Sequence, residues 1–259
     1  MLKYCEEFAE KFGDDQLNVI KYLTQLCEAE VNARYANRIK RRVKESRLPV
    51  GKSLATFDFA QIKSLNKPLI QGLSDNVQWI AQAENVLILG PSGVGKSHLA
   101  AAIGYAAIEQ GIRVYFASTS TLVQQLQLAR KEFQLPKAIA RLAKYPLLIL
   151  DDIGYAKKDT DETSVLFDLI VDRYESSSMI ITANQPFSEW DKIFSNNMMA
   201  IAAIDRLVHH ASIIKIESES FRRKHAKIKL EKINKSGSDA SSALSFPKSD
   251  NEDSHDEKK

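Results

Sequence analysis

One stretch of the chain combines the residue types and the spacing of a phosphate-binding loop (P-loop). It reads Gly90-Pro91-Ser92-Gly93-Val94-Gly95-Lys96-Ser97 and is followed directly by His98. Glycines let the backbone turn its N–H groups onto phosphate oxygens, a lysine at this spacing reaches the β- and γ-phosphates, and the serine hydroxyl is a ligand for Mg²⁺. We therefore assign residues 90–98 as candidate nucleotide ligands. The simpler alternative is a glycine-rich turn before a helix.

The elements predicted on either side of this loop favour the nucleotide interpretation. Residues 85–89 form an apolar run that suits a parallel strand buried on both faces, and residues 97–109 have the pattern of a helix. The first turn of a helix carries partial positive charge where the phosphates would lie. Strand, loop and helix in this order are the setting that the motif requires.

Two carboxylates follow a second apolar run. Residues 147–150 predict a buried strand, and Asp151 and Asp152 come directly after it, with Asp151 55 residues beyond Lys96. A hard cation prefers carboxylate oxygen, so we assign Asp151 as a Mg²⁺ ligand beside the P-loop, together with Ser97. Asp152 is then placed to orient or polarise an attacking water. Two acids after a strand are by themselves more typical of a strand-ending turn, and their place in an alternating β/α pattern favours the site.

An asparagine and a late arginine complete the candidate set. Asn184 follows a strand predicted at 178–182, and its amide could contact both the γ-phosphate and the attacking water. The alternative is an asparagine that caps the turn before Pro186. Arg206 lies in a helix predicted at 201–208, where the residues alone favour an ion pair on the helix surface.

Other groups that could hold a metal are sparse in the sequence. His209 and His210 lack carboxylate or cysteine partners at ligand spacing, which favours packing or surface exposure over a metal site. Cys5 and Cys27 are the only cysteines, and they lack the CxxC or histidine spacing of a zinc site. We expect two reduced thiols without a structural role.

Composition bounds the class of protein. The chain has 259 residues, of which 44% are apolar, and a formal net charge of +3, values that fit one α/β core with small additions. No apolar run approaches the roughly 18 to 20 residues needed to span a bilayer, and the N-terminus lacks the apolar core of a signal peptide. We expect a cytoplasmic protein without membrane association.

Shifts in composition predict four segments. They are a helical N-terminal module (1–48), a linker with a leading helix (49–84), an α/β core (85–235) and a disordered tail (236–259). The elements predicted inside them are helices at 2–12 and from about 14 to 46, one helix at 68–79, a strand at 113–117, helices at 119–130, 137–145 and 162–175, and a last strand at 212–216.

The end of the N-terminal module is rich in positive charge. Between Arg34 and Lys52, eight lysines or arginines accompany a single acid. Such a helix face is either a solvated surface or a contact surface for nucleic-acid phosphates. The residues that we assign as candidate DNA contacts are Arg34, Arg38, Arg41, Arg42 and Lys44.

Several of these motifs together resemble the IstB family of the AAA+ superfamily, whose members are ATP-binding helper proteins of insertion-sequence transposition and relatives of the helicase loader DnaC. The resemblance extends from the basic helix to about Arg223, and the first 25 residues and the tail after Lys235 add nothing to it. The segments that carry it are 57–59, 90–100, 150–155, 181–190 and 205–211.

The resemblance implies a P-loop NTPase of AAA+ type, a three-layer sandwich with a five-stranded parallel sheet. It implies ATP and Mg²⁺ as cofactors, and an ATPase that assembles on DNA of little sequence preference and recruits or stimulates a partner transposase. In the family pattern Asn184 is sensor 1, and Arg206 is an arginine finger that completes the ATP site of a neighbouring subunit. Many relatives have Glu where Asp152 stands, so hydrolysis is expected to be slow. We expect no second helical lid domain after 216, since only about 20 basic, helix-prone residues separate Ile216 from the predicted tail.

Two other functions share parts of this pattern. A replicative helicase loader would use the same ATP site with an N-terminus that docks on a helicase. A P-loop kinase would need an acceptor pocket and often arginine-rich lids, whereas the basic residues here lie outside the core. A transposase that works alone is disfavoured, because once Asp151 and Asp152 are assigned to ATP we can place no separate constellation of carboxylates for two-metal strand cleavage.

Overall fold

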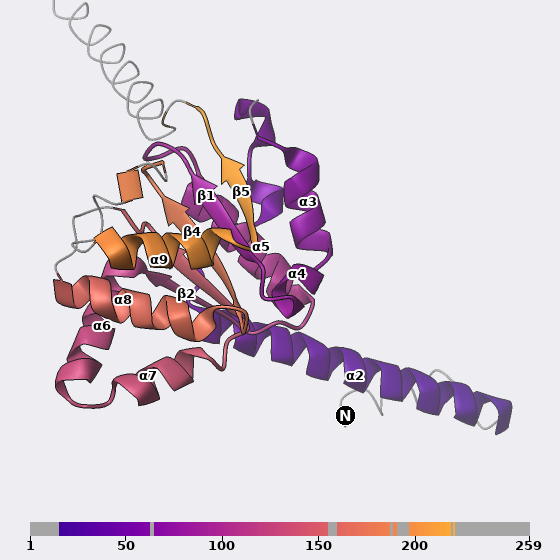
Figure 1. The fold of residues 1–259 in the computed structure, drawn as a ribbon. Helices are drawn as coiled ribbons and strands as arrows, with labels where there is room; N and C mark the ends of the chain where they lie inside the picture. Colours follow the sequence, from indigo (N-terminus) through magenta and orange to yellow (C-terminus); the bar gives the residue numbers. More distant parts are fainter. Residues whose placement is uncertain are drawn as a thin grey trace, which may run out of the picture.

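Five short strands form one parallel sheet at the centre of the molecule (Figure 1). The computed structural model describes residues 16–62, 65–154, 160–186, 189–190, 197–218 and 220. The strands are β1 (Asn85–Leu89), β2 (Val114–Ser118), β3 (Leu147–Asp151), β4 (Ser178–Ala183) and β5 (Ala211–Lys215). They lie in the order β2-β3-β4-β1-β5, and every neighbouring pair is parallel. The predicted five-stranded parallel sheet is confirmed.

Alternation along the strands divides the core into two layers. Val86 and Ile88 face one layer and Leu87 and Leu89 face the other, and all four are buried. Figure 1 shows helices on both sides of the sheet. The helices of the first layer are α2 (Gln16–Ser46), α3 (Lys67–Asp75), α4 (Gln78–Ala81) and α5 (Lys96–Glu109); those of the second are α6 (Thr119–Lys131), α7 (Leu135–Leu142), α8 (Thr160–Arg173) and α9 (Asn197–Val208). This is the predicted three-layer sandwich.

The predicted single helix at 68–79 is wrong. The structure has α3 and α4 there, separated at Asn76 and Val77. The break has a local cause, because the Asn76 side chain accepts a hydrogen bond from the backbone N–H of Gln78 at 2.8 Å and so begins a new helix. The indole of Trp79 donates to the Leu73 carbonyl across the break and fixes the angle between the two pieces.

Other boundaries differ from the predicted ones by one to four residues. Helix α7 begins two residues earlier than 137, since Pro136 fits the first turn of a helix, where its missing N–H is not needed. Helix α6 is capped by Ser118 rather than by the threonine and serine after it, because the Ser118 hydroxyl accepts from the N–H of Thr121. Helix α9 begins four residues before 201.

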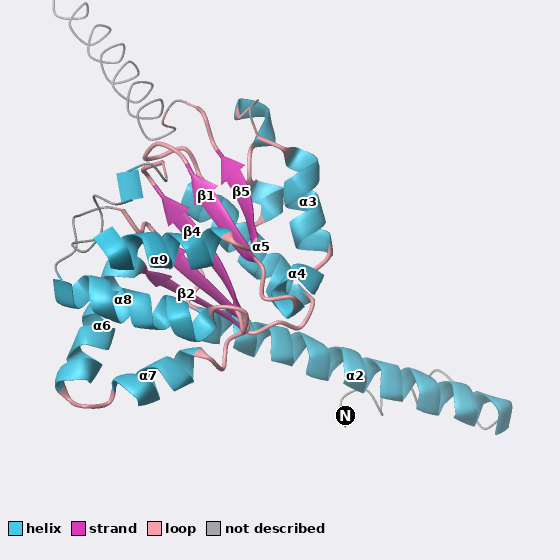
Figure 2. Cartoon of the chain, viewed as in Figure 1, coloured by secondary structure: helices cyan, strands magenta, loops and turns pink. Residues whose placement is uncertain are grey.

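Helix α2 confirms the long helical pattern that ends near Ser46. Its C-terminal part packs on α5 and β2 through Ile39 and Val43, and its other end projects from the core (Figure 2). The linker after it contains two short 3₁₀ helices, η1 (Leu54–Thr56) and η2 (Phe59–Gln61). The predicted helix at 2–12 and the predicted tail at 236–259 lie outside the described residues. Among the helices that the structure describes, none is both long and apolar enough to cross a bilayer.

One buried arginine holds the amino edge of the sheet together. Arg173, at the end of α8, is 2% exposed and donates hydrogen bonds to the backbone carbonyls of Leu142, Tyr145, Pro146 and Ser178 at 2.9 to 3.3 Å. Burial lowers the pKa of Arg173 to about 10, so the guanidinium remains charged at neutral pH. A planar group with five donors can satisfy several carbonyls that a turn would otherwise leave unpaired.

We expect Arg173→Met to lower the free energy of unfolding by about 3 kcal/mol, because it removes four hydrogen bonds that a buried, charged donor makes to backbone carbonyls. Urea denaturation checks this value. Arg130→Met is the matched control, since Arg130 is half-exposed and pairs with Asp168 at 3.5 Å; its replacement should cost less than about 1 kcal/mol. Equal effects of the two variants would contradict the role assigned to Arg173.

Candidate functional site

The carboxyl ends of β1, β3 and β4 meet at one edge of the sheet and border a cavity of about 450 Å³. This volume lies within the usual range for small-molecule sites. The cavity is lined by Lys52, Thr56, Phe57, Asp58, Ser92, Gly93, Gly95, Lys96, Ser97, His98, Asp151, Asp152, Thr182 and Asn184. The structure therefore brings the predicted loop and the two predicted carboxylates to the same place.

The loop before α5 has a shape that requires glycine at two positions. Gly90 has φ +155°, and a Cβ there would lie 2.4 Å from the carbonyl oxygen of Ile216. Gly95 has φ +102° and precedes the first residue of α5, and a Cβ there would lie 3.2 Å from the Phe57 ring. The loop thus keeps an open cradle at a helix N-terminus, which fits the phosphates of a nucleotide. The Val94 side chain turns inward and is fully buried in the core.

Lys96 is the charged group at the centre of the site. It is 6% exposed, and its Nζ donates to the carbonyls of Gly90 and Pro91 at 2.8 Å and to the Oδ1 of Asn184 at 2.5 Å. A buried ammonium needs such acceptors to offset its removal from water. The lysine is therefore held between the loop and the end of β4.

Asn184 connects this lysine to the acidic strand end. Its Nδ2 donates to the Oδ1 of Asp152 at 2.6 Å, while its Oδ1 accepts from Lys96. The Asn184 side chain thus points along the sheet edge. Because it contacts Lys96 and Asp152, it does more than cap the turn before Pro186. This arrangement follows from the strand order, because β4 lies between β1 and β3.

Thr182 is a site residue that the sequence reasoning missed. Its Oγ1 donates to the Oδ1 of Asp151 at 2.7 Å and accepts from the backbone N–H of Asp152 at 2.8 Å. It lies two residues before Asn184, so the two side chains leave the strand on the same face. The available signal was a hydroxyl residue near the carboxyl end of the strand, two positions before Asn184.

The backbone at Asp152 has a conformation that is uncommon for residues other than glycine. Its φ is +63°, in the left-handed region that aspartate tolerates better than most residues. The hydrogen bond from Asp152 N to Thr182 and a second one from Ile153 N to the Thr182 carbonyl at 2.9 Å hold it there. The turn directs the Asp151 and Asp152 carboxylates to different partners.

The linker after α2 forms a wall of the cavity. His98, the last predicted nucleotide ligand, places its Nε2 at 3.1 Å from both the Thr56 hydroxyl and the Ser53 carbonyl. The Phe57 ring is buried, packs edge-on against Phe59 and His98, and also borders the cavity. Phe57 thus packs in the core and also adds an apolar surface to the site.

Arg206 is not brought to this cavity. It lies in the last turn of α9, just before β5, whose first residue pairs with Asn85 at the amino end of β1. Its Nη1 donates to the Ala202 carbonyl at 2.8 Å, and its guanidinium lies 5.6 Å and 5.8 Å from the ring centres of Phe167 and Tyr174. Within the described residues, Arg206 therefore contacts a carbonyl and two aromatic rings, and not the acidic partner of a surface ion pair.

The basic residues of α2 divide into two groups. At 100° per residue, Arg34, Arg38 and Arg41 share the face opposite the core-facing Ile39 and Val43, and all three are exposed. Arg34 pairs with Glu30 at 2.8 Å and Arg41 lies 3.8 Å from Glu45, so part of this charge is balanced within the helix. Lys44 is exposed on a flanking face, whereas Arg42 is half-buried beside Gly111.

Comparison with known proteins identifies relatives along most of the chain. The family model described as IstB-like ATP binding protein matches residues 1–229, and so includes the first 25 residues, to which the sequence motifs had added nothing. An insertion sequence ATP-binding protein of Sinorhizobium fredii is 48% identical over 85% of this chain and 74% of its own length. Proteins of the insertion sequences IS21 of Pseudomonas aeruginosa and IS5376 of Geobacillus stearothermophilus are 35% and 37% identical, over 83% and 92% of their lengths.

Solved structures share the fold at low sequence identity. A DnaA bound to AMPPCP and single-stranded DNA aligns with a TM-score of 0.55 over 73% of this chain and 57% of that one, at 21% identity. The DnaC helicase loader aligns with a TM-score of 0.51 over 58% of this chain and 87% of that one, also at 21% identity. The fold is thus shared with DnaA and DnaC, and the chain belongs to the family of IstB-like ATP binding proteins of insertion sequences.

Proposed function

We propose that this protein is a DNA-dependent ATPase that regulates insertion-sequence transposition by assembling on target DNA and recruiting or stimulating a partner transposase. The observation that carries the proposal is the separation of its ATPase residues between two ends of one subunit. Lys96, Asp152 and Asn184 meet at the carboxyl edge of the sheet, whereas Arg206 lies beyond the amino end of β5.

The carboxyl edge supplies the groups that bind ATP. The N–H groups of the loop and the first turn of α5 face the phosphates, and Lys96 offsets their charge. Ser97 and Asp151 would hold Mg²⁺, since both border the cavity and offer hard oxygen ligands. When bound, the cation neutralises charge on the phosphate oxygens. Phe57 gives the cavity an apolar wall that suits the base.

Asp152 is the group that receives the proton of the attacking water. Asn184 donates to its Oδ1 at 2.6 Å and so fixes the direction of the carboxylate. The Asn184 amide also accepts from Lys96. It thus links Asp152 to the lysine that contacts the β- and γ-phosphates. The aspartate side chain is shorter than glutamate by one methylene and reaches less far into the cavity. We therefore expect slow turnover.

Arg206 acts in a second subunit. A five-residue strand spans roughly 16 Å, so β5 keeps the guanidinium far from the loop of its own chain. Placed against the cavity of a neighbour, the same arginine stabilises charge on the transferred phosphoryl group. The packing on Phe167 and Tyr174 restricts the guanidinium before the subunits assemble. Arg206 therefore loses little further side-chain entropy when it enters the neighbouring site.

We assign DNA binding to α2. The family of the chain is the reason for proposing a transposase as the partner. Arg34, Arg38 and Arg41 form an exposed row on a helix that projects from the core, a shape that can follow a phosphate backbone. The named relatives are ATP-binding proteins of insertion sequences, which favours a transposase over a helicase as the partner. The likeness to DnaC concerns the fold alone.

A mixing experiment tests the shared site. Arg206→Ala should bind ATP normally but hydrolyse it roughly 10³-fold more slowly with duplex DNA present, and Lys96→Ala should not bind ATP. A mixture of the two variants should regain activity, because the intact Arg206 of one subunit completes the ATP site of the other. Steady-state phosphate release and the mass of the DNA-bound complex are the measurements.

Arg130→Ala, on the exposed part of α6, controls for the removal of an arginine and should behave as the wild type. Failure of the mixture to regain activity would remove the arginine finger from the proposal. A monomeric ATPase that ignores DNA would remove the proposal as a whole.

Substitution of Thr182 tests the positioning of the two acids. Thr182→Val removes the hydroxyl that contacts Asp151 and Asp152 N while keeping the shape, so kcat should fall roughly 10- to 100-fold with Mg²⁺, as for other groups that orient metal ligands. ATP affinity without Mg²⁺ should not change. Thr182→Ser keeps the hydroxyl and should retain most of the activity; an equal decrease in both variants would contradict the hydrogen-bonding role.

The salt dependence of DNA affinity tests α2. Replacing Arg34, Arg38 and Arg41 by Gln should reduce the slope of log Kd against log salt by about 0.9 for each phosphate that the helix no longer neutralises. Fluorescence anisotropy with a labelled duplex gives this slope. Lys137→Gln/Arg141→Gln/Lys144→Gln, on and just after α7, removes the same number of positive charges and is the control for total charge. An unchanged slope in the α2 variant would show that its basic face is only solvated.

A further inference from the structure

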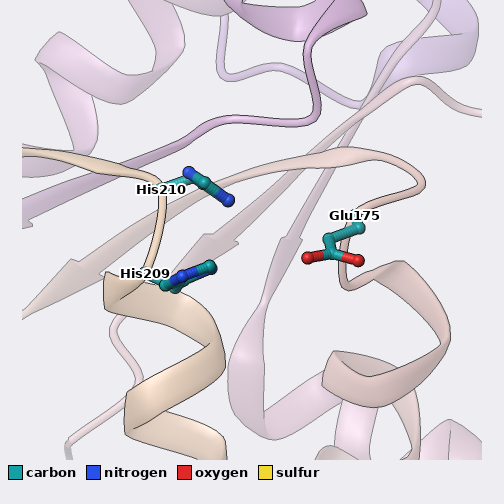
Figure 3. Close-up of side chains that lie close together, drawn as sticks. All are labelled: Glu175, His209 and His210. Atoms are coloured by element: carbon teal, nitrogen blue, oxygen red, sulfur yellow. The ribbon is translucent and has the colours of Figure 1, made fainter.

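Three side chains that commonly bind metals gather at the amino edge of the sheet, away from the nucleotide cavity. Glu175 follows α8, and His209 and His210 lie between α9 and β5 (Figure 3). One ligand atom from each residue lies within 4.8 Å of the other two, and all three side chains are exposed. The sequence argument considered only partners at ligand spacing along the chain, whereas Glu175 is 34 residues away from His209 and reaches the histidines only through the fold.

A second contact prepares one of these histidines for metal binding. His209 Nδ1 lies 3.1 Å from the hydroxyl of Tyr174. Histidines that bind metals usually donate their other ring N–H to an oxygen, which fixes the tautomer and the direction of the ring. If Nδ1–H donates to the Tyr174 oxygen, the lone pair of Nε2 is left for a cation.

The spacing needs only a small contraction. Two ligands on one tetrahedral ion, with bonds of about 2.1 Å, lie roughly 3.4 Å apart. The three atoms here lie within 4.8 Å of one another, so each pair must approach by at most about 1.4 Å, which rotation of exposed side chains can supply. Figure 3 shows the Glu175 carboxylate directed from its turn toward the two imidazoles.

We propose that Glu175, His209 and His210 bind a divalent transition-metal cation such as Zn²⁺. Two imidazoles and one carboxylate favour Zn²⁺, Co²⁺ or Ni²⁺ over Mg²⁺ and Ca²⁺, which prefer oxygen ligands. The cation would join the α8–β4 turn to the α9–β5 turn beside Tyr174, whose ring also contacts Arg206. The proposal is independent of the function proposed above.

The test measures Zn²⁺ binding to the untagged, full-length protein after treatment with EDTA. A chromophoric chelator competes for Zn²⁺ in the presence of excess Mg²⁺ and without ATP, so that the nucleotide site does not contribute. We expect one Zn²⁺ per chain, and at least a roughly tenfold rise in Kd for each of His209→Ala, His210→Ala and Glu175→Gln. All three residues are exposed, so the metal-free variants should melt at the wild-type temperature.

Two controls separate this site from other ligands in the chain. The double variant His225→Ala/His255→Ala removes two further histidines, and Cys27→Ser removes an exposed thiol. Neither should change the Zn²⁺ affinity. The proposal is overturned if the wild type binds no Zn²⁺ at micromolar concentration, or if these controls weaken binding while the three site variants do not.

Discussion

The nucleotide site depends on the position of β4 between the strand that carries the phosphate loop and the strand that carries the acids. Because all three strands are parallel and in register, their carboxyl ends lie side by side, and the residue after β4 must face both neighbours. Asn184 is that residue. With one acceptor and one donor in its amide, it contacts the lysine on one side and the acid on the other.

The same hydrogen bonds give the two acids different surroundings. Asp151 accepts from the Thr182 hydroxyl, whereas Asp152 accepts from the Asn184 amide. In the function proposed above, separate partners let one carboxylate hold a cation and the other receive a proton. The left-handed backbone at Asp152 separates the directions of the two side chains. We infer that this uncommon backbone conformation serves the proposed chemistry.

The sequence predicted well those features that depend on contiguous residues. The strand, loop and helix around Lys96 and the acidic end of β3 could be read because each is a local pattern with its own spacing. The break at Asn76 was missed, because one side-chain hydrogen bond competed with an otherwise helical pattern. Thr182 and Glu175 were missed for a different reason. Their partners lie 30 or more residues away, and only the packing of the strands and turns brings them together.

The sheet also limits how the proposed ATPase could be controlled. Strand β5 pairs with β1 along its whole length, so Arg206 cannot approach Lys96 of the same chain unless β5 leaves the sheet. Control by assembly of subunits requires no such change, since it only places the amino edge of one sheet against the carboxyl edge of another. Helix α2 packs on α5, and the Tyr35 hydroxyl donates to the Glu109 carbonyl at the C-terminal end of α5, whose N-terminal end holds the phosphate loop. Helix α5 therefore connects the proposed DNA-binding surface on α2 to the proposed ATP site. In this proposal, DNA that orders neighbouring α2 helices also sets the distance between each Arg206 and the cavity of the next subunit.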